Sequence, residues 1–259
     1  MMRALNTAGS GMLAQQTNLD VLANNLANAN TTGFKSQRAQ FADLMYQTTA
    51  VSSGEQNGRP AAMQVGLGSL WTGNATDVSQ GAPVQTNSPL NLAINGQGFF
   101  KLVGPDGSNV YTRDGSFTQD ATGQLVTQQG YVLEPSVVIP PGSTNVSIDM
   151  NGKVTATTPG SSTPTLITTI NLTTFPNPAG LTRIGSNLYQ EGGGSGSATD
   201  GAPGTNGAGT LQAGYIEGSN VQVVNEMVNM ITAQRAYEIN SKAIQTADAM
   251  LQVANNIKQ

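Results

Sequence analysis

Carboxylates are the only side chains in this sequence that offer a familiar catalytic chemistry. The 259-residue chain contains no His and no Cys. The commonest general base, the commonest metal ligand and the thiol nucleophile are therefore all missing. Paired carboxylates could still perform general acid–base work, as they do in glycoside hydrolysis. A catalytic site would require two Asp or Glu residues to be brought together.

Two groups of acidic residues are the candidates for such a pair. The first falls at predicted hairpin turns, where Asp commonly hydrogen-bonds nearby backbone: Asp106, Asp114 and Asp120. The second falls on a predicted C-terminal helix, where an exposed charge is ordinary: Glu226, Glu238 and Asp248. Arg235 on that helix could reach a carboxylate of an adjacent helix, although a solvated Arg is the commoner case. The sequence predicts no enzyme, no cofactor and no metal site.

The composition points to a protein that packs against copies of itself. Only 10% of the residues are charged and the net charge is −4. The basic residues form no stripe, which argues against nucleic-acid binding. No apolar run is long enough to span a bilayer, so we expect no membrane insertion. Amides and hydroxyls can be buried at a subunit contact at lower cost than charges, although a merely low-complexity surface is the alternative.

The first twenty residues do not read as a secretory signal. Polar residues such as Asn6, Ser10 and Gln15 interrupt the apolar stretch that such a signal needs. If the protein leaves the cytoplasm, we expect export without a cleaved signal peptide.

Both ends of the chain carry apolar residues at steps of seven, which indicates helical seams. The N-terminal seam consists of Leu5, Met12, Leu19, Leu22 and Leu26, with Ala8 and Ala29 at alternate positions. The C-terminal seam consists of Val223, Met230, Tyr237, Ile244 and Leu251, with Ala233, Ala247 and Ala254 at alternate positions. Residues 1–35 and 219–259 are therefore predicted to form one discontinuous terminal coiled coil. A helix packed on its own domain is the alternative.

The boundaries of these helices have local signals. Gly33 is predicted to terminate the first helix, which runs to about Ala29. Ser219 and Asn220 are predicted to cap the closing helix. Residues 36–74 read as an extended or flexible connecting stretch, in which the apolar patch from Phe41 to Tyr46 could form one or two helical turns.

Residues 75–218 are predicted to form an antiparallel β body, which makes the chain an α+β protein. Asp114–Gly115 and Asn151–Gly152 are typical of two-residue hairpin turns between alternating apolar runs. Residues 192–209 are rich in Gly, Ser and Thr and almost free of apolar side chains, so we expect a mobile loop there.

Several stretches resemble bacterial flagellar rod and hook proteins. The amino-terminal signature runs from Asn18 to Asn28, including Asn24 and Asn25, and continues through Thr32-Gly33-Phe34-Lys35. The motifs Leu92–Phe100 and Tyr111–Phe117 resemble the β domain that this family shares. Further similar motifs are Asn187–Tyr189, Glu217–Val221 and Gln234–Asn240, the last of which contains Arg235. The resemblance covers nearly the whole chain.

The resemblance implies a structural protein of the flagellar basal body. Its length and the stretch after Lys35 are similar to the distal-rod branch of the family, whose subunits assemble into a tubular drive shaft that passes torque from motor to hook. The implied partners are copies of itself in a helical tube, proximal rod and hook-side axial proteins, the ring bushing and the type III export apparatus. The implied location is the periplasmic rod.

Other functions remain open on the sequence. A proximal rod subunit of the same family is the nearest alternative. A rod-associated peptidoglycan hydrolase would need two carboxylates facing each other across a cleft. A phage-tail or adhesin fibre would be expected to show tandem repeats, which the sequence lacks.

Overall fold

The computed structural model describes residues 2–50, 63–143, 145–158 and 163–257. The chain is an α+β protein that divides into two compact units. The helical unit comprises residues 1–27, 37–76 and 222–259, and the body unit comprises residues 28–36 and 77–221. Within the described ranges, no helix combines the length and apolar character needed to cross a bilayer.

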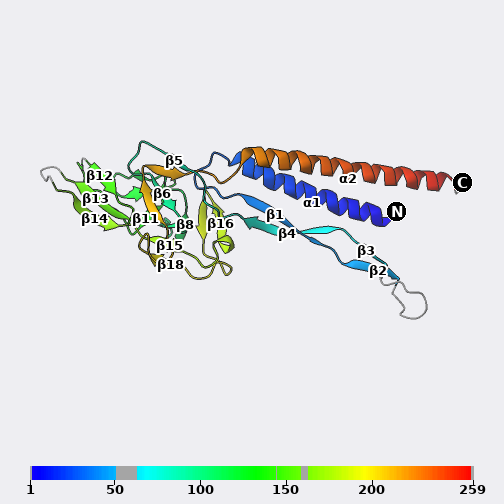
Figure 1. Ribbon diagram of the computed structural model, residues 1–259, viewed down its shortest axis with the longest axis horizontal. Coiled ribbons are helices and arrows are strands. Elements are labelled where there is room, and N and C mark those ends of the chain that lie inside the picture. Colours follow the sequence, from blue (N-terminus) through cyan, green and yellow to red (C-terminus); the bar gives the residue numbers. More distant parts are fainter. Residues whose placement is uncertain (1, 51–62, 144, 159–162, 258–259) are drawn as a thin grey trace. The chain divides into compact units, whose positions relative to one another are not determined.

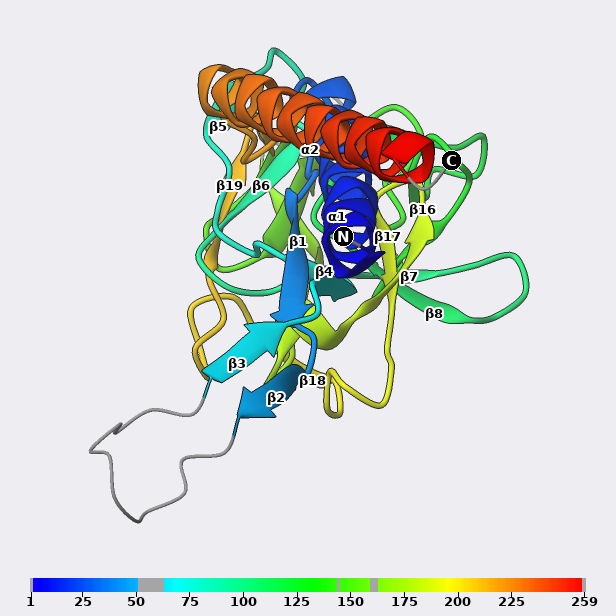
Figure 2. The same ribbon diagram turned by 90° about the vertical axis from the view of Figure 1, so that its right-hand side faces the viewer.

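The helical unit is built on two long helices that lie side by side and run in opposite directions (Figures 1 and 2). Helix α1 spans Met2–Ala27 and helix α2 spans Val223–Ile257. Small residues allow the two helices to approach closely. A Cβ atom at Gly11 of α1 would lie 3.1 Å from the side-chain Nδ2 of Asn240 in α2, and Ala233 is only 4% exposed.

The predicted helix caps are wrong at both ends. Helix α1 ends at Ala27, well before Gly33. Helix α2 begins at Val223, after Asn220, whose side-chain oxygen instead accepts a hydrogen bond from the backbone amide of Ser36. Gly33 and Asn220 both resemble helix-capping residues in the sequence, but in the structure both take part in tertiary contacts of the body unit.

An antiparallel ribbon, which we call the arm, packs along α1 in the helical unit. Strand β1 (Gln37–Asp43) pairs with β4 (Ser69–Thr76), and β2 (Tyr46–Ala50) pairs with β3 (Met63–Gly66). The predicted helical turns between Phe41 and Tyr46 are wrong, because this segment finds a strand partner that is distant in sequence. Residues 51–62, which belong to the predicted connecting stretch, lie outside the described residues.

The body unit is dominated by a seven-stranded sheet with the order β16-β17-β8-β7-β11-β10-β9, in which each neighbouring pair is antiparallel. Its strands, in chain order, are β7 (Phe100–Val103), β8 (Asn109–Thr112), β9 (Thr118–Gln119), β10 (Leu125–Val126), β11 (Val132–Glu134), β16 (Thr182–Gly185) and β17 (Leu188–Gln190).

Smaller sheets and a short 3-10 helix complete the body unit. One sheet has three strands, β12 (Asn145–Ile148), β13 (Lys153–Thr157) and β14 (Thr165–Thr169). Three further sheets are pairs of strands: β15 (Leu172–Thr174) with β18 (Thr199–Gly201), β6 (Leu92–Asn95) with β19 (Thr210–Ala213), and β5 (Pro83–Gln85) with β20 (Tyr215–Glu217). The 3-10 helix η1 spans Pro178–Gly180.

One predicted hairpin is confirmed and the other is wrong. Strands β12 and β13 pair across Asn151–Gly152, where Gly152 has a φ of +80°. Strand β8, by contrast, pairs with β7 and β17 rather than with β9. Gly115 serves a close backbone approach there, since a Cβ atom would lie 1.6 Å from the carbonyl oxygen of Leu92.

Residues 192–209, for which the sequence predicts a mobile loop, contain regular structure. Strand β18 lies inside this segment and pairs with β15. Ser195 is completely buried, and its hydroxyl donates to the carbonyl oxygen of Gly192. Low apolar content hid this order from the sequence, because hydrogen bonds rather than large side chains hold the segment.

Two apolar clusters hold the body unit together. The larger lies among the strands and includes Phe100, which meets Phe117 edge to face with ring centroids 5.2 Å apart. The smaller is mainly aromatic and comprises Phe99, Tyr111, Phe175, Leu181 and Tyr189. Edge-to-face contacts of this kind add to the stabilisation from burial.

Candidate functional site

Helix α2 carries a row of exposed apolar side chains, which we call the outer stripe. It consists of Val224 (74% exposed), Val228 (57%), Ile231 (49%), Ile239 (66%) and Val253 (58%). Their spacing follows one face of a helix, opposite the face that carries the buried Ala233. An exposed apolar face of this length is typical of an interaction surface.

Most of the seam residues predicted from the sequence lie in the helix pair. Leu22 is buried, and seven others are partly buried: Leu5, Met12, Leu19, Leu26, Met230, Ile244 and Leu251. Val223 and Tyr237 are more open, at 42% and 40% exposed. Arg235 is exposed in the middle of the outer stripe, and within the part of the chain that the structure describes it forms no ion pair.

Asn25 ties helix α1 to the arm. Its side chain is 1% exposed, donates to the carbonyl oxygen of Gln37 at 2.8 Å and accepts from the Gln37 amide at 2.9 Å. Asn24 is exposed on the same helix. Asn28 lies beyond the helix in the body unit, where its side-chain oxygen accepts from the hydroxyl of Thr31.

Asn25 also contacts Glu226 at the start of α2. Partial burial raises the pKa of the Glu226 carboxyl, and the hydrogen bond with Asn25 partly offsets that rise. One buried carboxylate oxygen, Oε2, has no hydrogen-bond partner. The ionised form of Glu226 is therefore poorly accommodated in the folded helical unit.

Glu226→Gln is expected to stabilise the helical unit near pH 7. A raised folded pKa favours folding fully at low pH, and that contribution is lost as pH rises through the folded value. Gln stays neutral, so the variant should gain up to about 1 kcal/mol near pH 7, limited by solvent screening at this partly exposed site. The gain should vanish near pH 4. Urea unfolding followed by Trp71 fluorescence measures the stability of the variant at pH 7 and at pH 4. Glu238→Gln is the control at an exposed position. Equal gains in stability at the two pH values would contradict a raised pKa as the cause.

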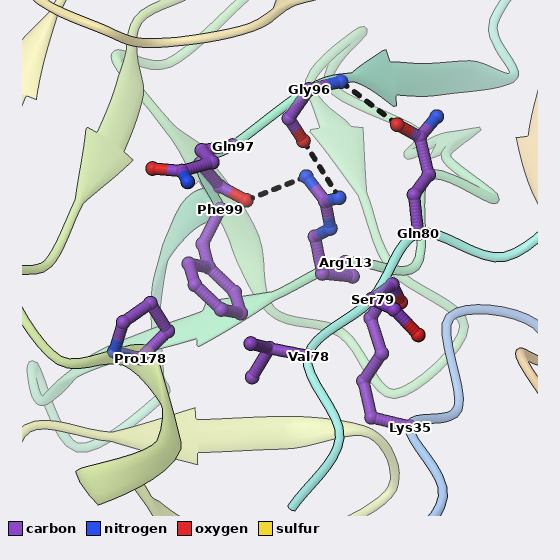
Figure 3. A pocket seen from close by; sticks show the side chains of 10 residues that line it. Lys35, Val78, Ser79, Gln80, Gly96, Gln97, Phe99, Arg113 and Pro178 are labelled. Carbon is purple, nitrogen blue, oxygen red and sulfur yellow. Dashed lines mark hydrogen bonds between the residues drawn. The ribbon is translucent and has the colours of Figure 1, made fainter.

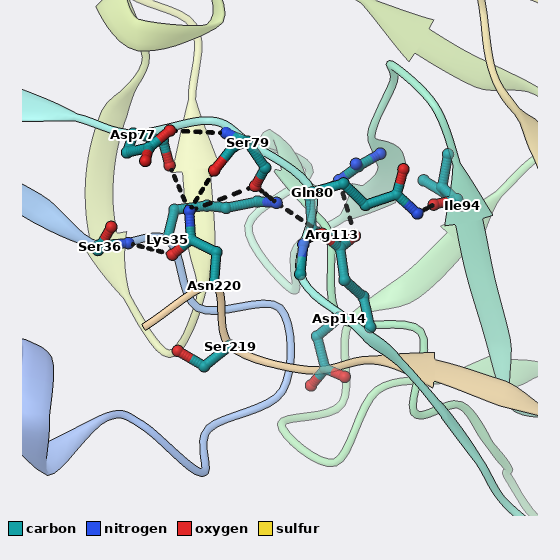
Figure 4. A network of polar contacts seen from close by, with 12 residues as sticks. Lys35, Ser36, Asp77, Ser79, Gln80, Ile94, Arg113, Asp114, Ser219 and Asn220 are labelled. Atoms are coloured by element: carbon teal, nitrogen blue, oxygen red, sulfur yellow. Dashed lines mark hydrogen bonds and ion pairs between the residues drawn. The ribbon is translucent and has the colours of Figure 1, made fainter. Parts of the chain in front are cut away.

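A cluster of buried charges lies in the body unit (Figure 4). Glu217 is 1% exposed and receives Lys35 Nζ at 2.6 Å on Oε1 and Arg113 Nε at 3.0 Å on Oε2. Lys35 and Arg113 are themselves only 2% and 4% exposed. Desolvation lowers the pKa of both cations, and the carboxylate of Glu217 opposes that shift.

Arg113 also fixes the loop that connects β6 and β7. Its guanidinium donates to the carbonyl oxygen of Gly98 at 2.8 Å and to that of Gly96 at 2.9 Å (Figure 3). Gln80 holds the same loop through the Gly96 amide. A pocket of about 350 Å³ opens beside these groups, with Phe99 among its apolar lining residues.

Gly33 and Phe34 belong to the same part of the body unit. Gly33 has a φ of +67°, and its amide donates to the backbone carbonyl of Glu217 at 2.8 Å. Phe34 is 7% exposed and receives the Arg183 guanidinium over its ring at 5.5 Å. Both residues therefore organise the body rather than the end of a helix.

Sequence reasoning did not single out Lys35, Arg113 or Glu217 as a site. Each lies in a different family-like motif, namely Thr32–Lys35, Tyr111–Phe117 and Glu217–Val221. A useful signal was present, because charges are scarce in this sequence and each of these motifs carries at least one. Nothing local indicated that the three would meet.

Two of the acidic residues considered for chemistry, Asp114 and Asp120, hold local turns. Asp114 accepts hydrogen bonds from the amide and hydroxyl of Ser116, and Asp120 accepts from the amide of Ala121. Among the described residues, no group of three or more His, Cys, Asp or Glu side chains could hold a metal ion.

Comparison with known proteins identifies the family. Three family descriptions match: "Flagella basal body rod protein" over residues 5–35, "Flagellar hook protein FlgE/F/G D1 domain" over residues 93–156 and "Flagellar basal body rod FlgEFG protein C-terminal" over residues 212–257. The flagellar basal-body rod protein FlgG of Borreliella burgdorferi is 48% identical over 264 residues, covering all of both chains. The chain belongs to the flagellar basal-body rod protein family.

Two other rod proteins agree with this assignment. FlgG of Caulobacter vibrioides is 46% identical over 99% of this chain and 100% of its own. FlgG of Buchnera aphidicola subsp. Schizaphis graminum is 48% identical over 97% and 98%. The chain is thus a structural subunit of the flagellar basal-body rod and not an enzyme, and it associates with copies of itself and with other axial proteins.

Proposed function

We propose that this chain forms the distal part of the rod, polymerising into a tubular shaft that passes torque from motor to hook. The outer stripe of α2 carries the proposal. Its apolar side chains are between 49% and 74% exposed, and burying them against neighbouring subunits would favour association. The full-length similarity to FlgG proteins supports the distal position over the proximal alternative.

Within a subunit, α1 and α2 would form an antiparallel coiled coil. The α2 residues that fit its inner heptad positions are Glu226, Met230, Ala233, Tyr237, Asn240, Ile244, Ala247 and Leu251. They alternate steps of four and three, as knobs-into-holes packing requires. Residues 1–35 and 219–259 would then serve axial assembly, and residues 75–218 would form the β body.

The rod would lie in the periplasm, inside a ring bushing, and its subunits would reach it through the flagellar type III export apparatus. The family assignment supports this location and these partners. Low charge on the subunit suits the close contacts of such a polymer, since few charges would lose solvent on assembly.

A tag inserted after Gly193 would test the distal assignment. This glycine is exposed and has open space around it, and the insertion lies outside strand β18. Electron microscopy of labelled basal bodies should place the tag along the distal rod. Labelling confined to the proximal rod would contradict the assignment.

The arm is the proposed element that stiffens the rod by bridging subunits. Its exposed apolar side chains include Phe41 (40% exposed), Tyr46 (55%), Leu70 (56%) and Trp71 (46%). Phe41 and Trp71 lie opposite each other in the ladder between β1 and β4 and so project to the same face. An apolar face on a two-stranded ribbon needs a covering partner.

Deleting residues 46–66 is expected to leave subunits that fold but build weak or bent rods. The deletion removes β2 and β3 and retains the pairing of β1 with β4, which contacts α1. Electron microscopy of isolated basal bodies, together with swimming assays, measures the effect. Rods of normal length and straightness would rule out bridging by the part of the arm that β2 and β3 form.

A further inference from the structure

The chain crosses between the body unit and the helical unit four times, after residues 27, 36, 76 and 221, and the body stretches beside the last three crossings meet inside the body. They are residues 33–36, which lead into β1, residues 77–81, which follow β4, and residues 217–220, which precede α2. We call them the three exits. They come from the beginning, the first third and the end of the chain, so no local interaction would bring them together.

Glu217 contacts both other exits. Its carboxylate Oε1 accepts from Lys35 Nζ at 2.6 Å and from the Gly81 amide at 2.9 Å. Its backbone carbonyl accepts from the Gly33 amide at 2.8 Å. The other carboxylate oxygen faces Arg113, which fixes the loop between β6 and β7. One residue therefore links the exits to one another and to the core of the body.

Two further side chains repeat these links. Lys35 Nζ also donates to the carbonyl oxygen of Ser79 at 2.7 Å. The side chain of Asn220 accepts from the Ser36 amide at 2.7 Å and donates to the carbonyl oxygen of Asp77 at 3.0 Å (Figure 4). Each exit is thus bonded to both of the others.

The charges of the cluster make Glu217 indispensable among these residues. Two buried cations share this single buried carboxylate. Removing one partner of a buried ion pair leaves an uncompensated charge, which costs far more than the pair contributes. Loss of Glu217 would leave two such charges, whereas loss of Lys35 would leave a neutral pair of Arg113 and Glu217.

We propose that Glu217 is an electrostatic latch that holds the three exits of the body unit in one fixed arrangement. Because a chain emerges from its amino terminus, Lys35 and Arg113 are made first, and the body cannot close around them until the segment at 217–220 arrives. The latch makes completion of the body depend on the last part of the chain before α2. This role is independent of the proposed position in the rod.

Glu217→Gln in the full chain tests the latch. It keeps the size of the side chain and removes its charge. Hydrogen exchange measured by mass spectrometry should become about a hundredfold faster in all three exits together, since a broken buried ion pair favours opening. Glu134→Gln is the control, because Glu134 pairs with Lys101 at the surface and its loss should leave the exits unchanged. Faster exchange at residues 217–220 alone, or none, would overturn the proposal.

Lys35→Met provides a test that does not depend on the folding of Glu217→Gln. By itself it should speed exchange at residues 33–36 and 77–81 by less than Glu217→Gln does, because Arg113 keeps its partner. The double variant Lys35→Met with Glu217→Gln should exchange more slowly in the exits than Glu217→Gln alone, because only one buried cation, Arg113, is then left without a partner. Additive effects in the double variant, as expected for a packing role alone, would overturn the latch.

Discussion

Replacing Val228 and Ile231 together with glutamate is expected to abolish incorporation of the subunit into the rod without unfolding the monomer. Both side chains are about half exposed in the outer stripe, at 57% and 49%. Exposed substitutions of this kind usually change stability by no more than about 0.5 kcal/mol. At a subunit contact, by contrast, both carboxylates would lose solvent, and Arg235 could pair with at most one of them, so the other would be buried at a cost of several kcal/mol.

Two measurements separate these effects. Circular dichroism of the purified variant should show unchanged helix content, and electron microscopy should show basal bodies that lack the part of the rod built by this subunit. Gln234→Glu combined with Gln245→Glu adds the same charge to exposed positions at the side of the same helix. This control should assemble. Normal rods from the Val228 and Ile231 variant would exclude the outer stripe as an assembly surface.

The parts of the fold that follow from local repetition could be predicted from the sequence. Steps of seven located both helices, and the Asn151–Gly152 pair located the hairpin between β12 and β13. Both signals depend on residues that are close together in the chain. The outer stripe was missed because the same periodicity supports two faces of α2, and only the packing of α1 decides which one is covered.

The parts that depend on distant partners could not be predicted. The segment from Phe41 to Tyr46 forms strands only because residues 63–76 pair with it. Lys35 and Glu217 are 182 residues apart in sequence, and their ion pair exists only in the folded body. Family-like motifs marked these residues as notable, but their common purpose required the three-dimensional structure.

The glycine at position 33 illustrates how a correct residue can carry the wrong explanation. Its positive φ fits the predicted helix terminator, yet α1 ends at Ala27. The structure gives a different reason for glycine here. A Cβ atom at position 33 would lie 2.7 Å from the amide nitrogen of Asp114 and 2.9 Å from the carbonyl carbon of Arg113. Backbone from the Arg113 motif occupies the space that any side chain would need.

Gly33→Ala is therefore expected to destabilise the body unit by about 3 kcal/mol. About 1 kcal/mol comes from holding alanine at a positive φ, and the remainder comes from displacing packed backbone. Gly107→Ala is the matched control, because Gly107 has a φ of +72° and no atom within 4 Å of its would-be Cβ. The control should lose only about 1 kcal/mol.

Urea unfolding followed by the near-ultraviolet circular dichroism of the body tyrosines measures both changes. Trp71 fluorescence reports the helical unit instead, so the two signals distinguish damage to the body from general unfolding. Equal losses for the two alanine variants would show that backbone conformation alone demands glycine at position 33. A larger loss of unfolding free energy for Gly33→Ala would show that the close backbone contact with Arg113 and Asp114 also requires glycine. This contact lies two residues before Lys35, which pairs with Glu217.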